Sequence, residues 1–373
     1  MSNHTEAPQK NSNLVLSKKM LLMRLALVGA IVVALAGSFA YVAGWFTPDR
    51  LTPDSFIDAF EHANKLYPGF RRNHAKGVCL AGDFEGNGQG VRLSKALVFR
   101  AGHIPVTGRF AFAGGVPYMP DNQKSVRSMA LLFKLANGEE WRTGMNNIPV
   151  FTVNTPDGFY QQLLASTPDP QTGKIDPSKM KAFLEHHPET ARARAIISTF
   201  PFSSGFEDAA FNSLDAFQFI NQSGIVTPVR WSMIPIPITP PGGTPSGLNS
   251  SGANYLFDRL IAAVSRKPLQ WHLVVTVGQP GDATNDATVP WPDNREKIDV
   301  GTLTVARIEA EDSGNCRDIN FDPLVLPTGI EKSDDPLLTA RSATYSESFT
   351  RRAGEDKTPS AVNLNQHETV VKK

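Results

Sequence analysis

The longest uninterrupted apolar stretch of the chain lies near its N-terminus. Residues 25–46 carry no charged side chain, and a helix over these 22 residues would be about 33 Å long, enough to cross the hydrocarbon core of a bilayer. Basic residues just before it predict that residues 1–24 form a cytoplasmic tail and that residues 47–373 lie on the extracytoplasmic, periplasmic side. Three aromatic residues would anchor the far interface: Tyr41, Trp45 and Phe46.

Two other interpretations of this apolar stretch stay open. Ala34-Leu35-Ala36 resembles a signal-peptidase site, so cleavage would release the rest of the chain as a secreted protein. A buried core helix can have a similar composition. We favour an uncleaved anchor in the inner or cytoplasmic membrane, because the apolar run continues ten residues beyond Ala36.

Helical periodicity marks further segments downstream. Thr52-Pro53-Asp54 gives an N-cap followed by proline at the first helical position, and apolar residues then repeat at helical spacing to Leu66. Residues 177–186, 191–198 and 255–265 are also expected to be helical, and a Pro/Gly/Ser-rich loop covers residues 235–251. The chain after Arg352 is polar, and we expect it to be mobile at its end.

Alternating apolar and polar positions predict an antiparallel β structure. Asn137-Gly138 is a strong signal for a hairpin turn. A closed barrel of about eight strands with peripheral helices, an α+β fold, accounts for this pattern. A short strand and a loop are expected within residues 70–90, and further strands over 96–100, 105–112, 128–135, 147–154, 217–220, 225–234, 271–278 and 302–310.

Composition narrows the classes of function. The 373 residues are enough to bury a large core, and 37 Lys and Arg against 36 Asp and Glu leave a formal net charge of +1. We therefore expect no nucleic-acid partner. Cys79 and Cys316 cannot form a disulfide framework or a cysteine metal site by themselves, and a single bridge between them stays open. The oligomeric state is open too, and a homodimer is possible.

The most distinctive candidate chemistry lies near the C-terminus. Asp334-Asp335-Pro336 signals a helix start, and Arg341 and Tyr345 then fall four positions apart on one helical face. A tyrosine, whose pKa is ordinarily about 10, becomes an anionic ligand at neutral pH only where a cation and a metal favour the phenolate. Taken alone, the pair is more typical of a helix with surface arginines and a half-buried tyrosine.

Four more motifs precede this helix in a recognisable order. They are RRNHAKG at residues 71–77, VTGRF at 106–110, GMNNIPVF at 144–151, and the run from Asn320 to Leu338. With the R-x-x-x-Y helix, they resemble segments of the haem catalases, and most closely those of the shorter catalase-related peroxidases. The resemblance covers residues 67–352, and five motifs in family order are far more specific than any one of them.

The resemblance implies a site for haem b. Tyr345 would be the axial iron ligand as a phenolate, and Arg341 the cation that stabilises it. His74 would be the distal acid–base, and Asn146, or alternatively Asn147, would orient the peroxide. Arginines would hold the haem propionates and phenylalanines would form an apolar distal wall. These five residues are Arg71, Arg109, Arg352, Phe151 and Phe159.

Some positions depart from the pattern of the larger catalases. Ala111 stands where they have a serine that bonds the distal histidine, and Asn73 replaces an apolar neighbour, so the tautomer of His74 and the polarity of the pocket should differ. The chain also stops soon after Arg352, which suggests a shallower channel. Arg109 has an alternative interpretation as a cation on a strand surface.

These features predict a haem peroxidase active in oxidative stress. Its substrates would be hydrogen peroxide or organic peroxides and a small organic electron donor, with weak catalase activity. The alternatives are a hydroperoxide-rearranging enzyme that resembles allene oxide synthase, and a non-enzymatic haem-binding barrel.

Overall fold

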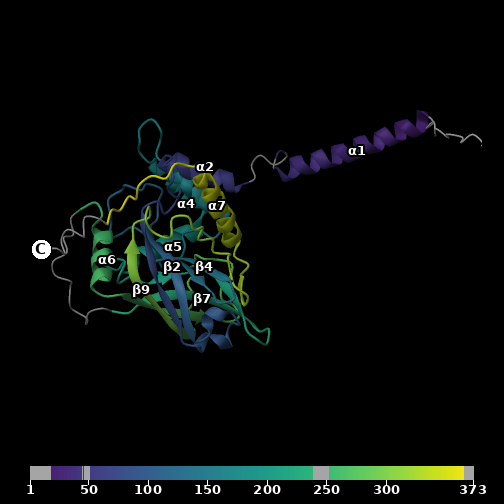
Figure 1. Ribbon diagram of the computed structural model, residues 1–373. Coiled ribbons are helices and arrows are strands. Elements are labelled where there is room, and N and C mark those ends of the chain that lie inside the picture. Colours follow the sequence, from purple (N-terminus) through teal and green to yellow (C-terminus); the bar gives the residue numbers. More distant parts are fainter. Residues whose placement is uncertain (1–17, 44, 46–50, 238–251, 365–373) are drawn as a thin grey trace, which may run out of the picture. The chain divides into compact units, whose positions relative to one another are not determined.

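The structure, a computed structural model, describes residues 18–43, 45, 51–237 and 252–364 (Figure 1). It divides into two compact units, Met1–Thr52 and Pro53–Lys373. In the first unit, helix α1 (Lys18–Val42) is long and apolar enough to cross a membrane, with a mean hydropathy of 2.3, and a signal segment would pass the same test. Helix α1 begins inside the predicted tail. Phe46 and residues 1–17 lie outside the described residues.

The second unit is built on ten antiparallel strands within the described residues. They are β1 (Gly77–Gly86), β2 (Gly102–Phe112), β3 (Arg127–Lys134), β4 (Glu140–Asn146), β5 (Phe211–Asn212), β6 (Phe217–Ile220), β7 (Val226–Pro235), β8 (Leu269–Val277), β9 (Lys297–Glu309) and β10 (Ile330–Lys332).

Eight of these strands close into a barrel. Their order is β7-β5-β4-β3-β2-β1-β9-β8, and β8 pairs with β7 to complete the ring. Strand β6 pairs with the first half of β7, and β10 continues from β6 as an extension of the sheet. The predicted eight-stranded antiparallel barrel is therefore confirmed.

Side chains alternate between the interior and the outer face of the barrel, as they must along a pleated strand. The inward positions of β2, β3 and β4 carry large side chains that are fully buried in the main core, among them Phe110, Phe133 and Trp141. The positions between them form two cross-strand rows on the outer face, Ala111–Ser128–Asn146 and Arg109–Ala130–Gly144. These two rows form the floor of the cavity described below.

Helices surround the barrel, and most of them begin with proline. They are α2 (Pro53–Asn64), α3 (Pro156–Ala165), α4 (Pro177–His186), α5 (Pro188–Thr199), α6 (Tyr255–Arg266) and α7 (Pro336–Ala353), with the short 3₁₀ helices η1 (Gln89–Arg92) and η2 (Leu97–Phe99). Helix α2 packs against both α3 and α7. Arg351 of α7 forms ion pairs with Asp54 and Asp58 of α2, so these two helices are held together on one side of the barrel.

Several predicted elements are wrong. Residues 96–100 contain η2 instead of a strand: Val98 and Phe99 are both fully buried, which a strand with one exposed face does not allow. A strand was expected at residues 147–154, but the second strand of the hairpin is β4, which ends at Asn146. The chain leaves the ladder there, and Asn147 Oδ1 accepts a hydrogen bond from the Arg127 amide at 2.7 Å.

Two other segments are more ordered than the sequence suggested. Helix α3 was not predicted, although Thr155 caps it by accepting a hydrogen bond from the Gly158 amide at 3.1 Å. After α7, Glu355 accepts a hydrogen bond from the Gly69 amide at 2.8 Å, and Val362 is fully buried. The tail therefore packs on the barrel as far as residue 364. Residues 238–251 of the predicted loop and 365–373 lie outside the described part.

Candidate active site

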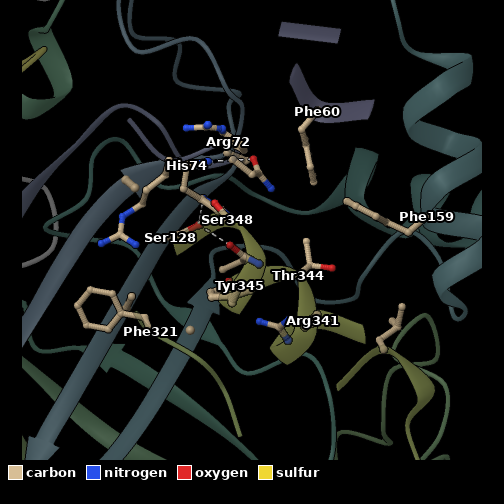
Figure 2. Close-up of a pocket in the computed structure, with 18 of the residues that line it drawn as sticks. Phe60, Arg72, His74, Ser128, Phe159, Phe321, Arg341, Thr344, Tyr345 and Ser348 are labelled. Atoms are coloured by element: carbon tan, nitrogen blue, oxygen red, sulfur yellow. Dashed lines mark hydrogen bonds between the residues drawn. The ribbon is translucent and has the colours of Figure 1, made fainter. Parts of the chain in front are cut away.

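A cavity lies between the two outer rows of β2–β4 and the helices α2, α3 and α7 (Figure 2). The cavity has a volume of about 310 Å³. In the view of Figure 2, His74 and Ser128 lie above Tyr345 and Arg341, with Phe60 and Phe159 to the right. All nine predicted site residues line this cavity: Arg71, His74, Arg109, Asn146, Phe151, Phe159, Arg341, Tyr345 and Arg352.

Helix α7 presents Arg341 and Tyr345 to the cavity. Asp335 fixes the start of the helix, because its Oδ1 accepts a hydrogen bond from the Leu337 amide at 2.9 Å. One turn further on, Arg341 forms an ion pair with the buried carboxylate of Asp215 and a hydrogen bond with Tyr345. Burial alone would lower the pKa of Arg341, but Asp215 and then Tyr345 raise it above its ordinary value. Tyr345 therefore has a permanent cation beside its hydroxyl group.

Gly144 of β4 lets this pair approach the barrel closely. A Cβ atom added at Gly144 would lie 3.7 Å from Arg341 Nη2 and 3.8 Å from Tyr345 Oη, which is ordinary van der Waals contact. Both polar groups of α7 therefore rest on the outer face of strand β4, and a longer side chain at this position would collide with them.

His74 occupies an unusual backbone conformation. Its φ angle of 58° lies in the left-handed region, which is uncommon for residues other than glycine. The neighbouring Asn73 supports this turn, since its Oδ1 accepts hydrogen bonds from the His74 amide at 3.0 Å and the Gly114 amide at 2.8 Å. Asn73 lines the cavity, as expected, but its side-chain oxygen already accepts two hydrogen bonds from the backbone of the loop.

The surroundings of His74 keep its imidazole neutral. Burial is the main reason that the pKa of His74 falls to about 3, and the positive charges of Arg109, Arg341 and Arg71 lower it further. A hydrogen bond to the backbone of Phe112 acts in the opposite direction. A neutral imidazole has one N–H donor and one free lone pair, so His74 can accept a proton at neutral pH.

A serine that the sequence did not point to contacts this histidine. His74 Nδ1 lies 3.1 Å from Ser128 Oγ, and Ser128 Oγ donates a hydrogen bond of 2.5 Å to Asn146 Oδ1. Asn147, the alternative amide, is buried, and its Oδ1 accepts from the Arg127 amide. The geometry therefore favours Asn146 as the amide beside His74.

Arg71, Arg109 and Arg352 bring three guanidinium groups close together. Burial lowers the pKa of Arg71, and the charges of Arg352 and Arg109 lower it further. Burial, followed by Arg109, lowers the pKa of Arg352 to about 10. Glu311 compensates one of these charges, since its carboxylate accepts hydrogen bonds from Arg109 Nε at 2.6 Å and Nη2 at 3.1 Å. Arg109 therefore belongs to a buried ion pair, which contradicts its alternative interpretation as a cation on a strand surface.

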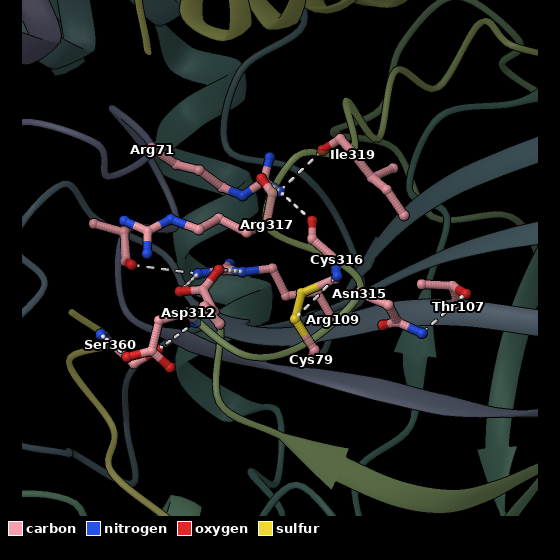
Figure 3. The surroundings of a disulfide bond; sticks show 12 residues. Arg71, Cys79, Thr107, Arg109, Asp312, Asn315, Cys316, Arg317, Ile319 and Ser360 are labelled. Carbon is pink, nitrogen blue, oxygen red and sulfur yellow. Dashed lines mark hydrogen bonds and ion pairs between the residues drawn. A yellow bond between two sulfur atoms is a disulfide. The ribbon is translucent and has the colours of Figure 1, made fainter. Parts of the chain in front are cut away.

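A disulfide bond between Cys79 and Cys316 holds the loop that supports these arginines (Figure 3). Arg71 Nη2 donates to the Ile319 carbonyl at 2.9 Å and to the Cys316 carbonyl at 3.1 Å. The bridge that the sequence left open is formed. It joins strand β1 to the loop whose carbonyl groups orient Arg71.

One donor of this cluster stays unpaired. Within the part of the chain that the structure describes, Arg71 Nε is buried without a hydrogen-bond partner. An unsatisfied buried donor costs about 1–3 kcal/mol, and more on a charged group. An anionic ligand in the cavity would remove this cost.

The comparison with known proteins identifies the family. A family model described as "Catalase" matches residues 44–373. The chain belongs to the catalase family. Catalase homologues are haem oxidoreductases that act on peroxide, so the resemblance in the motifs is confirmed at the level of the family.

The curated relatives include two shorter members of the catalase family. A catalase-related peroxidase from Synechococcus elongatus is 37% identical over 323 residues, which cover 86% of this chain and 94% of that protein. Another from Mycolicibacterium paratuberculosis is 29% identical, with 82% of this chain and 96% of that protein covered. Catalase A from Saccharomyces cerevisiae shares the fold, with a TM-score of 0.68 at 19% identity over 80% of this chain and 64% of that one. The chain thus spans less than two thirds of that solved catalase.

The cavity of this catalase-family protein fits a haem group. Haem has two carboxylates, an iron atom and a flat apolar ring. The unpaired Nε of Arg71 and the guanidinium groups beside it suit the carboxylates. The phenol of Tyr345 beside Arg341 suits ferric iron, for which tyrosine is a known ligand. Aromatic side chains suit the ring, and Phe151 stacks on Phe159 at a centroid distance of 5.9 Å.

Three kinds of residue at this site escaped the sequence analysis. Asp215 and Glu311 pair with predicted arginines, and Ser128 links His74 to Asn146. Helix α2 also contributes aromatic wall, since Phe56 and Phe60 lie 6.3 Å and 6.0 Å from Phe159 between ring centroids. The apolar spacing of α2 was visible in the sequence, but its direction toward the cavity was not.

Proposed function

We propose that the protein is a haem b peroxidase that reduces hydrogen peroxide or organic peroxides with a small organic electron donor. The observation that carries this proposal is the pairing, in one cavity, of a neutral His74 beside Asn146 with a Tyr345 that has a permanent cation at Arg341. The names of the two shorter relatives as catalase-related peroxidases support the choice of a peroxidase over a catalase.

Different residues would bind different parts of the cofactor. Tyr345 would hold the iron, with Arg341 stabilising the phenolate. Arg71, Arg109 and Arg352 would hold the propionates. When bound, haem b supplies a redox-active iron at which a peroxide can be reduced.

His74 would move the proton of the reaction. Its neutral ring accepts a proton from one peroxide oxygen and returns it to the other, so one residue serves as base and then as acid. Asn146 accepts from Ser128 through Oδ1, which leaves its Nδ2 group as a donor that can orient the peroxide. Phe151 and Phe159 would keep bulk water from the reacting atoms.

The proposed location is the extracytoplasmic side of a membrane, with α1 as anchor or signal segment. Basic residues precede α1, and cytoplasmic flanks are typically basic. The Cys79–Cys316 bridge is a second, independent support, because disulfide bonds persist mainly in oxidising compartments.

The test uses the purified full-length protein reconstituted with haem. We expect haem absorbance together with peroxide-dependent oxidation of a chromogenic donor. His74→Ala should lose at least about 100-fold in turnover, the usual scale of acid–base catalysis, while it keeps its haem. Tyr345→Phe should lose the haem or change its spectrum. His103→Ala, on an exposed residue of β2, is the matched control and should behave like wild type.

Three outcomes would contradict the proposal. Failure to bind haem would remove its basis. Bound haem without oxidation of a donor would point to a carrier. Conversion of a fatty-acid hydroperoxide without a donor would point to a rearranging enzyme.

A further inference from the structure

Ser128 occupies the middle of the outer row Ala111–Ser128–Asn146. It lies on β3, directly opposite Ala111 of β2 on one side and Asn146 of β4 on the other. Its hydroxyl contacts His74 Nδ1 at 3.1 Å and Asn146 Oδ1 at 2.5 Å. A single hydroxyl group therefore joins the two side chains that the proposed function assigns to the peroxide.

The direction of these hydrogen bonds favours one tautomer of His74. An amide oxygen can only accept, so the single hydroxyl proton of Ser128 goes to Asn146 Oδ1. Ser128 Oγ is then left as an acceptor toward His74, so this contact favours the ring proton on Nδ1, and the backbone of Phe112 is a second hydrogen-bond partner of the ring. In a neutral ring, a proton on Nδ1 leaves Nε2 unprotonated, as a base requires.

The position on the middle strand matters. Neighbouring strands lie about 4.8 Å apart, so a hydroxyl at position 111 would be two strands, about 10 Å, away from the row position of Asn146. A serine there could reach His74 but could not also hold the amide of Asn146. Position 128 can contact both, and this chain has its serine at 128 and an alanine at 111.

We propose that Ser128 is a positioning residue that sets the Nδ1–H tautomer of His74 and turns the Nδ2 donor of Asn146 away from the barrel. This inference rests on the proposed function for its effect on turnover, but not for its effect on the tautomer.

The test combines two measurements on the full-length protein. In the haem-free protein labelled with ¹⁵N-histidine, His74 should be the Nδ1–H tautomer, with its signals assigned by comparison with His74→Gln. Ser128→Ala should shift it toward the Nε2–H tautomer. In the haem-loaded protein, Ser128→Ala should lower kcat by about tenfold, the factor that corresponds to one hydrogen bond, at unchanged haem content. Ser128→Thr, which keeps the hydroxyl, should restore both.

Ser232 provides a matched control. It is a strand serine of β7 that lies opposite Asn212 and donates to its Oδ1 at 2.7 Å, so it repeats the Ser128–Asn146 pair further along the same row, where neither residue lines the cavity. Ser232→Ala should change neither the His74 tautomer nor kcat. The swap Ala111→Ser/Ser128→Ala should restore the tautomer but not the full kcat, because it cannot hold Asn146.

The outcomes separate the two proposals. An Nε2–H tautomer in the wild-type protein, or a Ser128→Ala variant with an unchanged tautomer, would overturn the role of Ser128 whether or not the protein is a peroxidase. Full recovery of kcat in the swap variant would overturn the coupling to Asn146. A shifted tautomer in Ser128→Ala, in a protein that never oxidises a donor, would support the role of Ser128 and contradict the peroxidase.

Discussion

At the scale of single residues, the site depends on how burial and nearby charges act on His74. Three arginines contribute to lowering its pKa, and two of them, Arg71 and Arg109, belong to the cluster that suits an anionic cofactor. Arginines that suit an anion therefore also keep His74 neutral. In the proposed role, His74 would not need a pKa near 7, because it would only have to be unprotonated when a peroxide binds.

This arrangement predicts how stability depends on pH. The unfolded chain binds a proton at His74 below about pH 6.5, and the folded protein does so only near its pKa of about 3. Stability should therefore fall as the pH falls through this window, by about 2 kcal/mol between pH 7 and pH 5. Urea denaturation of the haem-free protein at both values measures this loss.

His74→Gln is the comparison for this measurement. Between pH 7 and pH 5 its free energy of unfolding should fall by about 2 kcal/mol less than that of the wild type, since glutamine does not titrate. Asp335, whose pKa is raised by burial and then by Asp215 to about 7, gives an opposite slope, but both proteins share it. Equal losses in the two proteins would show that His74 titrates normally.

At the scale of elements, helix α7 reaches strand β4 through the side chains of Arg341 and Tyr345. The N-cap at Asp335 begins the helix, the Arg351 ion pairs tie it to α2, and the outer row of β4 receives its polar side chains. Gly144 lies beside both polar groups, because Arg341 Nη2 and Tyr345 Oη are within 4 Å of the Cβ that it lacks. The size of the residue at position 144 should determine where Arg341 and Tyr345 lie.

Two substitutions at Gly144 test this contact between α7 and β4. Gly144→Ala adds only the Cβ, for which there is room, and should keep haem binding and stability within about 1 kcal/mol of wild type. Gly144→Leu should displace Arg341 and Tyr345, with a loss of about 1–3 kcal/mol in the free energy of unfolding and a lower haem content. The ratio of haem to protein absorbance and urea denaturation measure the two effects. A leucine variant with normal haem content would show that α7 is held elsewhere.

At the scale of the whole molecule, two features lie outside the lining of the cavity. The disulfide bond joins residues 237 positions apart and fixes a loop that supports Arg71. The apolar helix α1 belongs to a unit of its own. Each of them leads to a separate prediction.

Removal of the disulfide should destabilise the fold and loosen the arginine cluster. Cys79→Ala/Cys316→Ala should lower the free energy of unfolding by about 2–5 kcal/mol, as measured by chemical denaturation under oxidising conditions. Haem affinity should fall as well, since the Cys316 and Ile319 carbonyls orient Arg71. Added reductant should destabilise the wild type and leave the double variant unchanged. Equal stability of the two proteins without reductant would contradict the prediction.

The N-terminal helix should decide where the protein is found and not whether it binds haem. The full-length chain should sediment with membranes and resist a carbonate wash, whereas a chain without residues 1–46 should be soluble and keep the same haem spectrum. N-terminal sequencing of the full-length product distinguishes the anchor from a cleaved signal. An intact N-terminus on a protein in the soluble fraction would refute the anchor.

Much of this protein follows from its sequence because the signals are local. The cap at Asp335, the spacing of Arg341 and Tyr345, and the alternation on β3 depend on neighbours within a few residues. Even the contact of Ser128 with Asn146 could have been predicted from the sequence. The turn at Asn137-Gly138 sets Lys134 opposite Glu140, and counting six places along each strand reaches this pair. Because the second strand of this hairpin was predicted at residues 147–154 instead of 140–146, the sequence analysis did not find this register.

Only the tertiary structure decided the partners of the charged groups. Asp215 reaches Arg341, Glu311 reaches Arg109, and Cys79 reaches Cys316 across separations of 126, 202 and 237 residues. No local pattern encodes such pairs, because closure of the barrel and packing of α7 bring them together. The sequence by itself determined the family and the barrel, and it indicated the candidate side chains that line the cavity. The folded chain determined which amide lies beside His74 and which hydroxyl holds it, because these depend on which way each side chain points.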